Sequence, residues 1–169
     1  MRSWLVLLIG LIIGAVAGAG GMLIAFPYLF PLPVVDEKVP TEAASGALKT
    51  VGTFKFDETA PGRDRVHWAN GTGTIFSSGG RTIIRLEDDF EAGPGPNYWI
   101  YLNTKFAGDE ESFLADAGRL KITPLKSFKR GQNYVLPDEI RIEDFTALTI
   151  WCESFSAYIA SAKLPPSAP

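Results

Sequence analysis

The sequence predicts an all-β domain, an antiparallel β-sandwich or, as the alternative, a β-barrel, preceded by one transmembrane helix. Three observations lead to this prediction. An uncharged apolar run stands at the amino terminus, a proline-rich stretch comes next, and the remaining residues form short apolar runs separated by Gly, Pro, Asn and Asp. We therefore divide the chain into an anchor (1–26), a Pro-rich spacer (27–47), a β domain (48–164) and a flexible tail (165–169).

The amino-terminal run extends from Trp4 to Phe26 without a charged residue. As a helix rising about 1.5 Å per residue, it would cross the roughly 30 Å hydrocarbon core of a bilayer. Arg2 precedes the run, whereas Asp36 and Glu37 follow it. Because the cytoplasmic flanks of membrane helices are enriched in basic residues, we expect a single-pass protein of the cell membrane, with a cytoplasmic amino terminus and an extracytoplasmic domain.

A cleaved signal peptide is the alternative for this segment, and the domain would then be secreted. Its apolar stretch would be Trp4–Ile13, and Ala15 with Ala17, or Ala17 with Ala19, would form the A-x-A-like cleavage site. The apolar character resumes at Met22–Phe26, however, and a discarded peptide has no need of it. We favour the uncleaved anchor, and both alternatives place the domain outside the cytoplasm.

The segment from Pro27 to about Ala47 is rich in proline. Proline at this density disfavours helix and favours an extended, semi-rigid backbone. We expect this spacer to lift the β domain off the membrane.

The β domain is predicted from residues that alternate in polarity or cluster in short apolar runs between turn signals. Only Glu110–Ala117 has even brief helical character. Many short strands without long helices between them favour an antiparallel sandwich or barrel. The expected strands are Lys49–Phe56, Arg65–Ala69, Gly73–Phe76, Thr82–Glu87, Tyr98–Asn103, Leu120–Pro124, Asn133–Leu136, Thr146–Cys152 and Ser156–Ala160.

Two turn sequences predict hairpins between neighbouring strands. Asn70-Gly71 stands between the second and third expected strands, and Ser77-Ser78-Gly79-Gly80 joins the third to the fourth. Both combinations supply residues that adopt the backbone conformations of tight antiparallel turns.

Charge and residue counts exclude several functions. A net charge of -3 leaves no basic excess to hold a phosphate backbone, so nucleic acid is not an expected partner. The single Cys152 and the single His67 allow no intramolecular disulfide, no Cys-rich zinc site and no metal site that needs two histidines, and we assign no metal site. The sequence has no hydrolase elbow, P-loop or dinucleotide fingerprint, so it gives no positive indication of an enzyme.

Cys152 is the principal candidate for chemistry. In a strand it shares a face with Leu148 and Ile150, whereas Thr149 and Trp151 share the other face. If the aliphatic face is the core, the thiol is a small buried hydrophobic group with a raised pKa and little reactivity. As the alternative, a cysteine at a strand end could be a one-thiol redox centre or ligate haem iron, with His67 as the second ligand.

Several further segments, taken together, carry a family resemblance. They are Gly52-Thr53-Phe54, His67 followed by Gly71-Thr72-Gly73-Thr74, Ile83-Ile84-Arg85-Leu86-Glu87 with Phe90, Gly95-Pro96-Asn97 before Tyr101-Leu102, Leu120 with Leu125-Lys126, Gly131-Gln132-Asn133-Tyr134 with Leu136-Pro137, Ile150-Trp151-Cys152 with Phe155, and Ala162 with Leu164. In order and spacing they resemble the DM13 domain, a small extracytoplasmic module of bacterial membrane-attached proteins that also occurs beside DOMON domains in animal proteins. The resemblance covers the chain after the spacer.

The resemblance implies an electron-transfer role in which Cys152 acts as a bare thiol or holds a group such as haem. His67 falls where family members often have histidine, which makes it a second candidate for cofactor binding. A covalent c-type haem is excluded because the chain has no C-x-x-C-H sequence. We thus expect a membrane-anchored redox domain with an unidentified redox or protein partner in the envelope. The alternative is a non-catalytic binding or scaffolding module in which Cys152 is structural.

Overall fold

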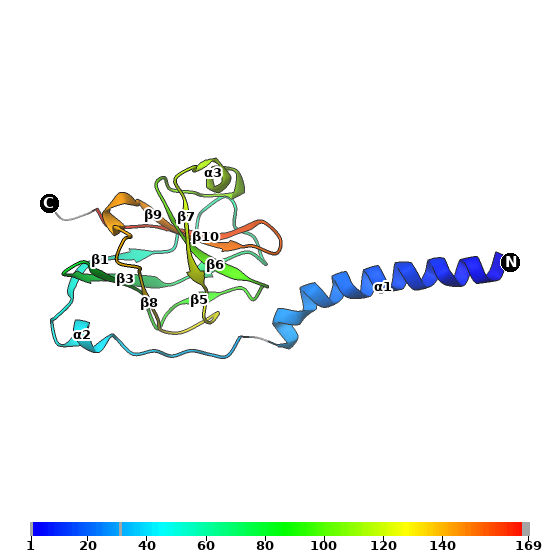
Figure 1. Cartoon of the computed structure of the whole chain (residues 1–169), viewed down its shortest axis with the longest axis horizontal. Coiled ribbons are helices and arrows are strands. Elements are labelled where there is room, and N and C mark those ends of the chain that lie inside the picture. The colour runs from blue at the N-terminus through cyan, green and yellow to red at the C-terminus, as the bar shows by residue number, and fades with distance from the viewer. Residues whose placement is uncertain (1, 31, 167–169) are drawn as a thin grey trace.

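The computed structural model describes residues 2–30 and 32–166, in which a β domain follows one long helix (Figure 1). The domain contains two four-stranded antiparallel sheets and a small two-stranded one. The first sheet has the order β1 (Lys49–Lys55), β3 (Thr72–Ser78), β4 (Arg81–Leu86), β8 (Gln132–Val135). The second has the order β10 (Ala157–Lys163), β9 (Ala147–Cys152), β6 (Tyr98–Asn103), β7 (Leu120–Pro124).

The predicted all-β sandwich is confirmed, and the barrel alternative is wrong. Each four-stranded sheet ends in two edge strands, β1 and β8 in the first and β10 and β7 in the second. A closed barrel would have paired these edges continuously. A single bridge between Phe56 and Ala162 joins the two sheets at one corner.

The main core lies between the two sheets because each strand there turns alternate apolar side chains inward. Ile84 and Leu86 of β4 and Leu148 and Ile150 of β9 are among its fully buried members. The inward placement of the Leu148, Ile150 and Cys152 face is therefore as predicted. Such a core removes enough apolar surface from water to hold a domain of this size without disulfides.

A second apolar cluster covers the outer face of the second sheet. Helix α3 (Glu110–Ala115) places Phe113 against Trp151 of β9, with their rings stacked at a centroid distance of 4.2 Å. The helix begins where Asp109 and Ser112 form a reciprocal capping box. Because both faces of β9 are covered, all six of its residues are buried.

One predicted hairpin is confirmed and the other is wrong. Strands β3 and β4 are joined by Gly79 and Gly80, whose φ angles of 61° and 88° suit a primed turn. Asn70-Gly71 makes no hairpin, because β2 (Ala69–Asn70) pairs with β5 (Glu91–Ala92) instead of β3.

The expected strand Arg65–Ala69 is also wrong, because only Ala69 belongs to a strand. Oδ1 of Asp64 accepts hydrogen bonds from the backbone N–H groups of Val66 and His67, both at 2.6 Å. An aspartate that bonds the backbone two and three residues on holds the chain in a turn. The local turn therefore replaces a strand at this point.

Helix α1 (Arg2–Leu29) projects from one end of the domain (Figure 1). From Ser3 to Leu29 it is long and apolar enough to cross a membrane. It continues past the predicted boundary at Phe26 and includes Pro27.

The segment after α1 runs back along the side of the domain (Figure 1). It is extended before the one-turn helix α2 (Thr41–Ala44), and another single turn, η1 (Ile142–Asp144), precedes β9. Glu37 holds the segment at edge strand β8, since its N–H donates to Gly131 O at 2.8 Å and its carboxylate accepts from the Asn133 N–H at 2.6 Å. The spacer is thus packed on the domain, which differs from the expectation that it lifts the domain away. Of the expected tail 165–169, residues 167–169 lie outside the described residues.

Candidate functional site

Cys152 is the last residue of β9 and lines a cavity together with residues of α1. In the sheet it stands between its two register partners, Tyr98 of β6 and Ala157 of β10. The residue is only 1% exposed. Its position at a strand end, and not its exposure, distinguishes it from the aliphatic residues further along the same face.

The surroundings of the sulfur favour the neutral thiol. Burial raises the pKa of Cys152, and although the backbone N–H groups of Ser154 and Phe155 bond the sulfur and lower the pKa, burial prevails. The Sγ–H donates to the carbonyl oxygen of Pro96 at 3.1 Å. The thiol is therefore protonated at neutral pH, and its hydrogen bond to Pro96 holds it in place. The two N–H groups are positioned to stabilise a thiolate if one forms.

His67 lies in the turn that Asp64 organises. Its ring Nδ1 is 2.9 Å from Asp64 Oδ2, and the side chain is 32% exposed. The hydrogen bonds from the backbone and side chain of His67 lower the pKa of Asp64 to about 2, so the carboxylate is ionised at neutral pH and accepts a hydrogen bond from Nδ1–H. The contact with Asp64 fixes the ring and leaves Nε2 available for other chemistry.

The structure brings Cys152 and His67 to one small cavity, which we call the Cys152 cavity. Its volume is about 50 Å³. The sequence could not predict this proximity, because the two residues lie on elements far apart in the chain. Helix α1 and the loop before β6 complete the wall; the lining residues are Ile24, Pro27, Tyr28, Val66, His67, Pro94, Gly95, Pro96, Tyr98, Cys152 and Phe155.

A haem between Cys152 and His67 does not fit this cavity. Pockets for drug-sized ligands measure roughly 300–1,000 Å³, whereas the Cys152 cavity holds about 50 Å³. Pro96 and Tyr98 lie beside the sulfur and leave no slot for a flat macrocycle, which is much larger than the cavity. The arrangement suits a bare thiol and a small reacting group, and it places the His67 imidazole where it could accept a proton.

A larger apolar groove adjoins the Cys152 cavity and shares Pro27, Gly95, Pro96 and Tyr98 with it. It has a volume of about 320 Å³. Phe26, Phe30 and Leu32 line one side of it, and Pro124, Leu125 and Phe128 of the domain line the other. We call this hollow the helix groove.

Sequence reasoning missed three residues that shape the site. Asp64 orients His67, Pro96 accepts the thiol hydrogen bond, and Tyr98 lines the cavity. Gly95 is needed beside them because a Cβ at this position would collide with the Tyr98 ring. An aspartate three residues before a histidine, and the glycine between two prolines, were the available signals.

Together the fold and the site define a class of protein: a small β-sandwich on an apolar helix, with one cysteine and one histidine that line a small cavity. The family model described as "Electron transfer DM13" matches residues 55–164. This chain belongs to the DM13 family, as the resemblance predicted. No curated protein and no solved structure matches the chain. The family match spans β2 to β10 and leaves out α1 and the spacer.

Proposed function

We propose that this chain is a membrane-anchored, extracytoplasmic redox domain in which Cys152 is the reactive group. The observation that carries the proposal is that its only cysteine lines a cavity at the molecular surface together with its only histidine. The description of the family as an electron-transfer domain supports the same role. We exclude a haem-dependent mechanism because the macrocycle does not fit the cavity.

The proposed chemistry is thiol–disulfide exchange with a disulfide of an envelope partner. Nε2 of His67 takes the thiol proton, and the N–H groups of Ser154 and Phe155 stabilise the thiolate. The thiolate attacks one sulfur of the partner disulfide, a mixed disulfide forms, and the second partner sulfur leaves as a thiolate that recovers the proton. Cys152 is oxidised and the partner sulfur is reduced, so electrons and protons balance.

The test is the formation of a reversible mixed disulfide on the folded chain. Full-length protein in detergent micelles is incubated with glutathione disulfide, and its intact mass is measured. The proposal predicts one glutathione adduct that a reductant removes, and no adduct on Cys152→Ser. An adduct that forms only after denaturation would refute the proposal.

The topology is part of the proposal. With Arg2 before the apolar run and α1 as an uncleaved anchor, the domain lies outside the cytoplasm. A periplasmic reporter fused after Leu164 is expected to be active, and mass analysis of the mature chain is expected to find residues 1–26 still attached. A cytoplasmic reporter signal would reverse the orientation, and a shortened chain would favour the secreted alternative.

The second candidate is a non-catalytic binding or scaffolding module of the envelope with a structural cysteine. The burial of Cys152 and its hydrogen bond to Pro96 favour it. In that case Cys152→Ala would lower stability and leave partner binding intact. The redox proposal predicts the reverse, a small change in stability and complete loss of the mixed disulfide.

A further inference from the structure

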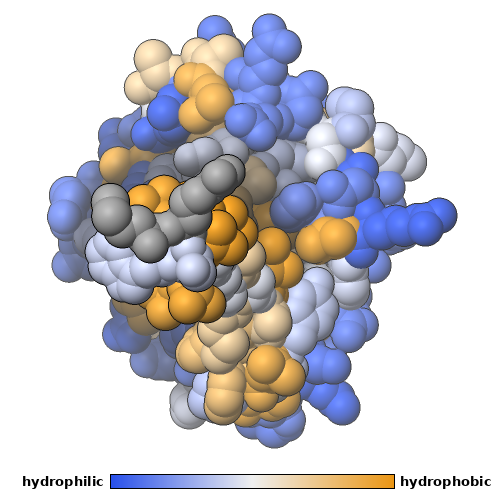
Figure 2. Space-filling view, turned by 90° about the vertical axis from the view of Figure 1, so that its right-hand side faces the viewer, coloured by the Kyte–Doolittle hydropathy of each residue, from blue (hydrophilic) through white to orange (hydrophobic). Residues whose placement is uncertain are grey.

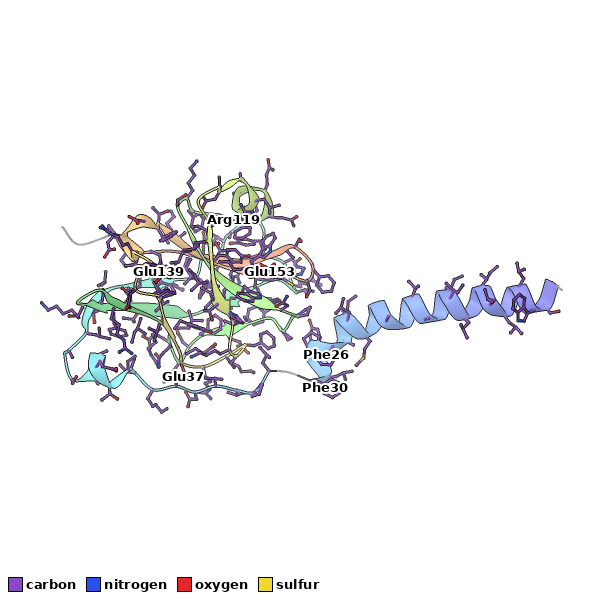
Figure 3. All side chains as sticks on the ribbon, viewed as in Figure 1. Phe26, Phe30, Glu37, Arg119, Glu139 and Glu153 are labelled. Atoms are coloured by element: carbon purple, nitrogen blue, oxygen red, sulfur yellow. The ribbon has the colours of Figure 1, made fainter. Side chains whose placement is uncertain are left out.

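The last turns of α1 touch the β domain directly. Ile24 and Pro27 line the Cys152 cavity, and Phe26 and Phe30 line the helix groove. Figure 3 places Phe26 and Phe30 beside the end of the domain from which α1 leaves. Ile24 belongs to the apolar span Ser3–Leu29. A domain in contact with a residue inside that span must lie at the surface of the membrane that holds the helix.

Exposed apolar side chains surround the same end of the domain. Val66 is 49% exposed and Phe155 is 44% exposed, and both line the Cys152 cavity. Figure 2 looks along α1 onto this end and shows hydrophobic residues around and below the helix, with hydrophilic ones towards the edges. Two large apolar side chains at loop tips next to a membrane helix are typical of surfaces that insert into the lipid interface.

The helix groove adds an apolar hollow at the same end. Its walls come from α1, from the residues directly after it and from the domain, and Phe26, Phe30 and Phe128 contribute rings. An apolar hollow open to water is unfavourable, whereas beside a bilayer it is filled by lipid hydrocarbon. The groove, Val66 and Phe155 together form what we call the helix-end face.

The spacer holds the helix-end face towards the membrane. Glu37 is hydrogen-bonded to Gly131 and Asn133, and its carboxylate is 2.9 Å from Lys126 Nζ. Its carbonyl oxygen also accepts from Arg85 Nη1 at 2.7 Å. Because only residues 30–36 separate the end of α1 at Leu29 from this fixed point, the domain stays close to the end of the helix.

We propose that the helix-end face docks on the outer surface of the bilayer that holds α1, so that the Cys152 cavity opens at the lipid–water boundary. The partner of this surface is the lipid bilayer. Reactants then meet Cys152 at the lipid–water boundary, where water-soluble ones still reach it from the aqueous side. The docking does not depend on the redox role of Cys152.

A fluorescence experiment tests the docking on the full-length chain. Cys152→Ser removes the only cysteine, so a second substitution, Phe155→Cys, directs an environment-sensitive dye to the helix-end face. The protein is reconstituted in vesicles of equal parts phosphatidylcholine and phosphatidylglycerol that carry a headgroup spin label. The proposal predicts that the spin label quenches most of the dye emission at position 155, and likewise for Val66→Cys.

The matched control is Glu139→Cys in the same background. Glu139 is exposed and lies at the end of the domain opposite Phe26 and Phe30 (Figure 3), so its dye is expected to keep its emission. Equal quenching at positions 139 and 155, or quenching at neither, would overturn the docking. Energy transfer between labelled copies without lipid quenching would identify a second chain as the occupant and would also overturn it.

Discussion

Arg85 and Cys152 are both buried, but their surroundings differ. The Arg85 side chain is 2% exposed and donates to Glu87 at 2.7 Å, to Asp88 at 2.6 Å and to the Glu37 carbonyl at 2.7 Å. Cys152 donates to one acceptor, Pro96 O, and lines a cavity whose other residues, apart from His67, are mostly apolar. We call the first region the Arg85 cluster.

The difference separates a structural region from the region that we propose to be reactive. A buried guanidinium is stable only when its donors are matched, and in the Arg85 cluster the two acidic residues after β4, Asn133 of β8 and the spacer carbonyl meet that need. The Cys152 cavity keeps unfilled space beside a thiol and an imidazole, which contributes little to stability. Substitutions in the Arg85 cluster are therefore expected to change the free energy of unfolding, and substitutions in the cavity to change reactivity.

The largest effect is expected from Arg85→Met, which leaves the acidic partners and the Glu37 carbonyl without their donor. We expect a loss of about 3 kcal/mol in the free energy of unfolding. Tryptophan fluorescence during urea unfolding of the full-length chain in micelles measures it. Arg81→Met, on the same strand but exposed, is the control and should cost less than about 0.5 kcal/mol. Similar losses for the two variants would remove the structural role of the cluster.

Two glycines allow the regions to be compared by the same substitution. A Cβ on Gly131 would lie within 2.6 Å of Asp88, Arg85 and the Glu37 carbonyl, and Gly131→Ala is expected to cost about 2 kcal/mol through overpacking. A Cβ on Gly95 would collide with the Tyr98 ring at the Cys152 cavity. Gly95→Ala is expected to change the rate of Cys152 modification, and Gly131→Ala to leave that rate unchanged. A changed modification rate for Gly131→Ala and an unchanged rate for Gly95→Ala would contradict the distinction between the Arg85 cluster and the Cys152 cavity.

A smaller effect is expected from Glu37→Gln, which keeps the shape but removes the charge. Burial raises the pKa of Glu37, but the Asn133 N–H and the Lys126 ammonium outweigh it and lower the pKa below its ordinary value of 4.5. A lowered carboxyl pKa stabilises the fold above the ordinary pKa, and this contribution is lost as the pH falls through the folded pKa. The variant should lose about 1 kcal/mol at pH 7 and little at low pH.

The measurement is the unfolding free energy of wild type and Glu37→Gln across the acid range. The two curves are expected to approach each other as the pH falls below 4.5 and through the lowered pKa of Glu37, because the carboxylate of the wild type is then protonated. A constant difference at every pH would show that the charge of Glu37 has no part in holding the spacer.

The smallest change in stability is expected from Asp64→Asn, because the side chain is more than half exposed. The pKa of Asp64, about 2 against an ordinary 3.8, makes its contribution full above pH 3.8 and lost as the pH falls towards 2. We expect a loss below about 1 kcal/mol. The expected readout is instead slower modification of Cys152, because His67 loses the carboxylate that orients it; an unchanged rate would remove His67 from the mechanism.

The strands were predictable from sequence where an apolar run extends over at least four residues, as in β6 and β9. Sequence-based prediction failed for β2 and β5, because strands of two residues each carry no periodic signal. The role of Arg85 was also hidden, because an arginine in a strand usually faces solvent, and its partners in the spacer lie 48 positions away. Cys152 and His67 were identified as candidates from their rarity, but only the fold brings them to one cavity.

The central claim is that Cys152 reacts in the folded protein. The most direct measurement is the rate of alkylation by iodoacetamide on the full-length chain without denaturant, followed by intact mass as the pH is raised. We predict one label per folded chain, at a rate that still increases above pH 9 because burial raises the pKa of Cys152 beyond its ordinary value of 9.0, and a slower rate for His67→Gln. Labelling that requires denaturant would contradict the claim and leave Cys152 as a packing residue.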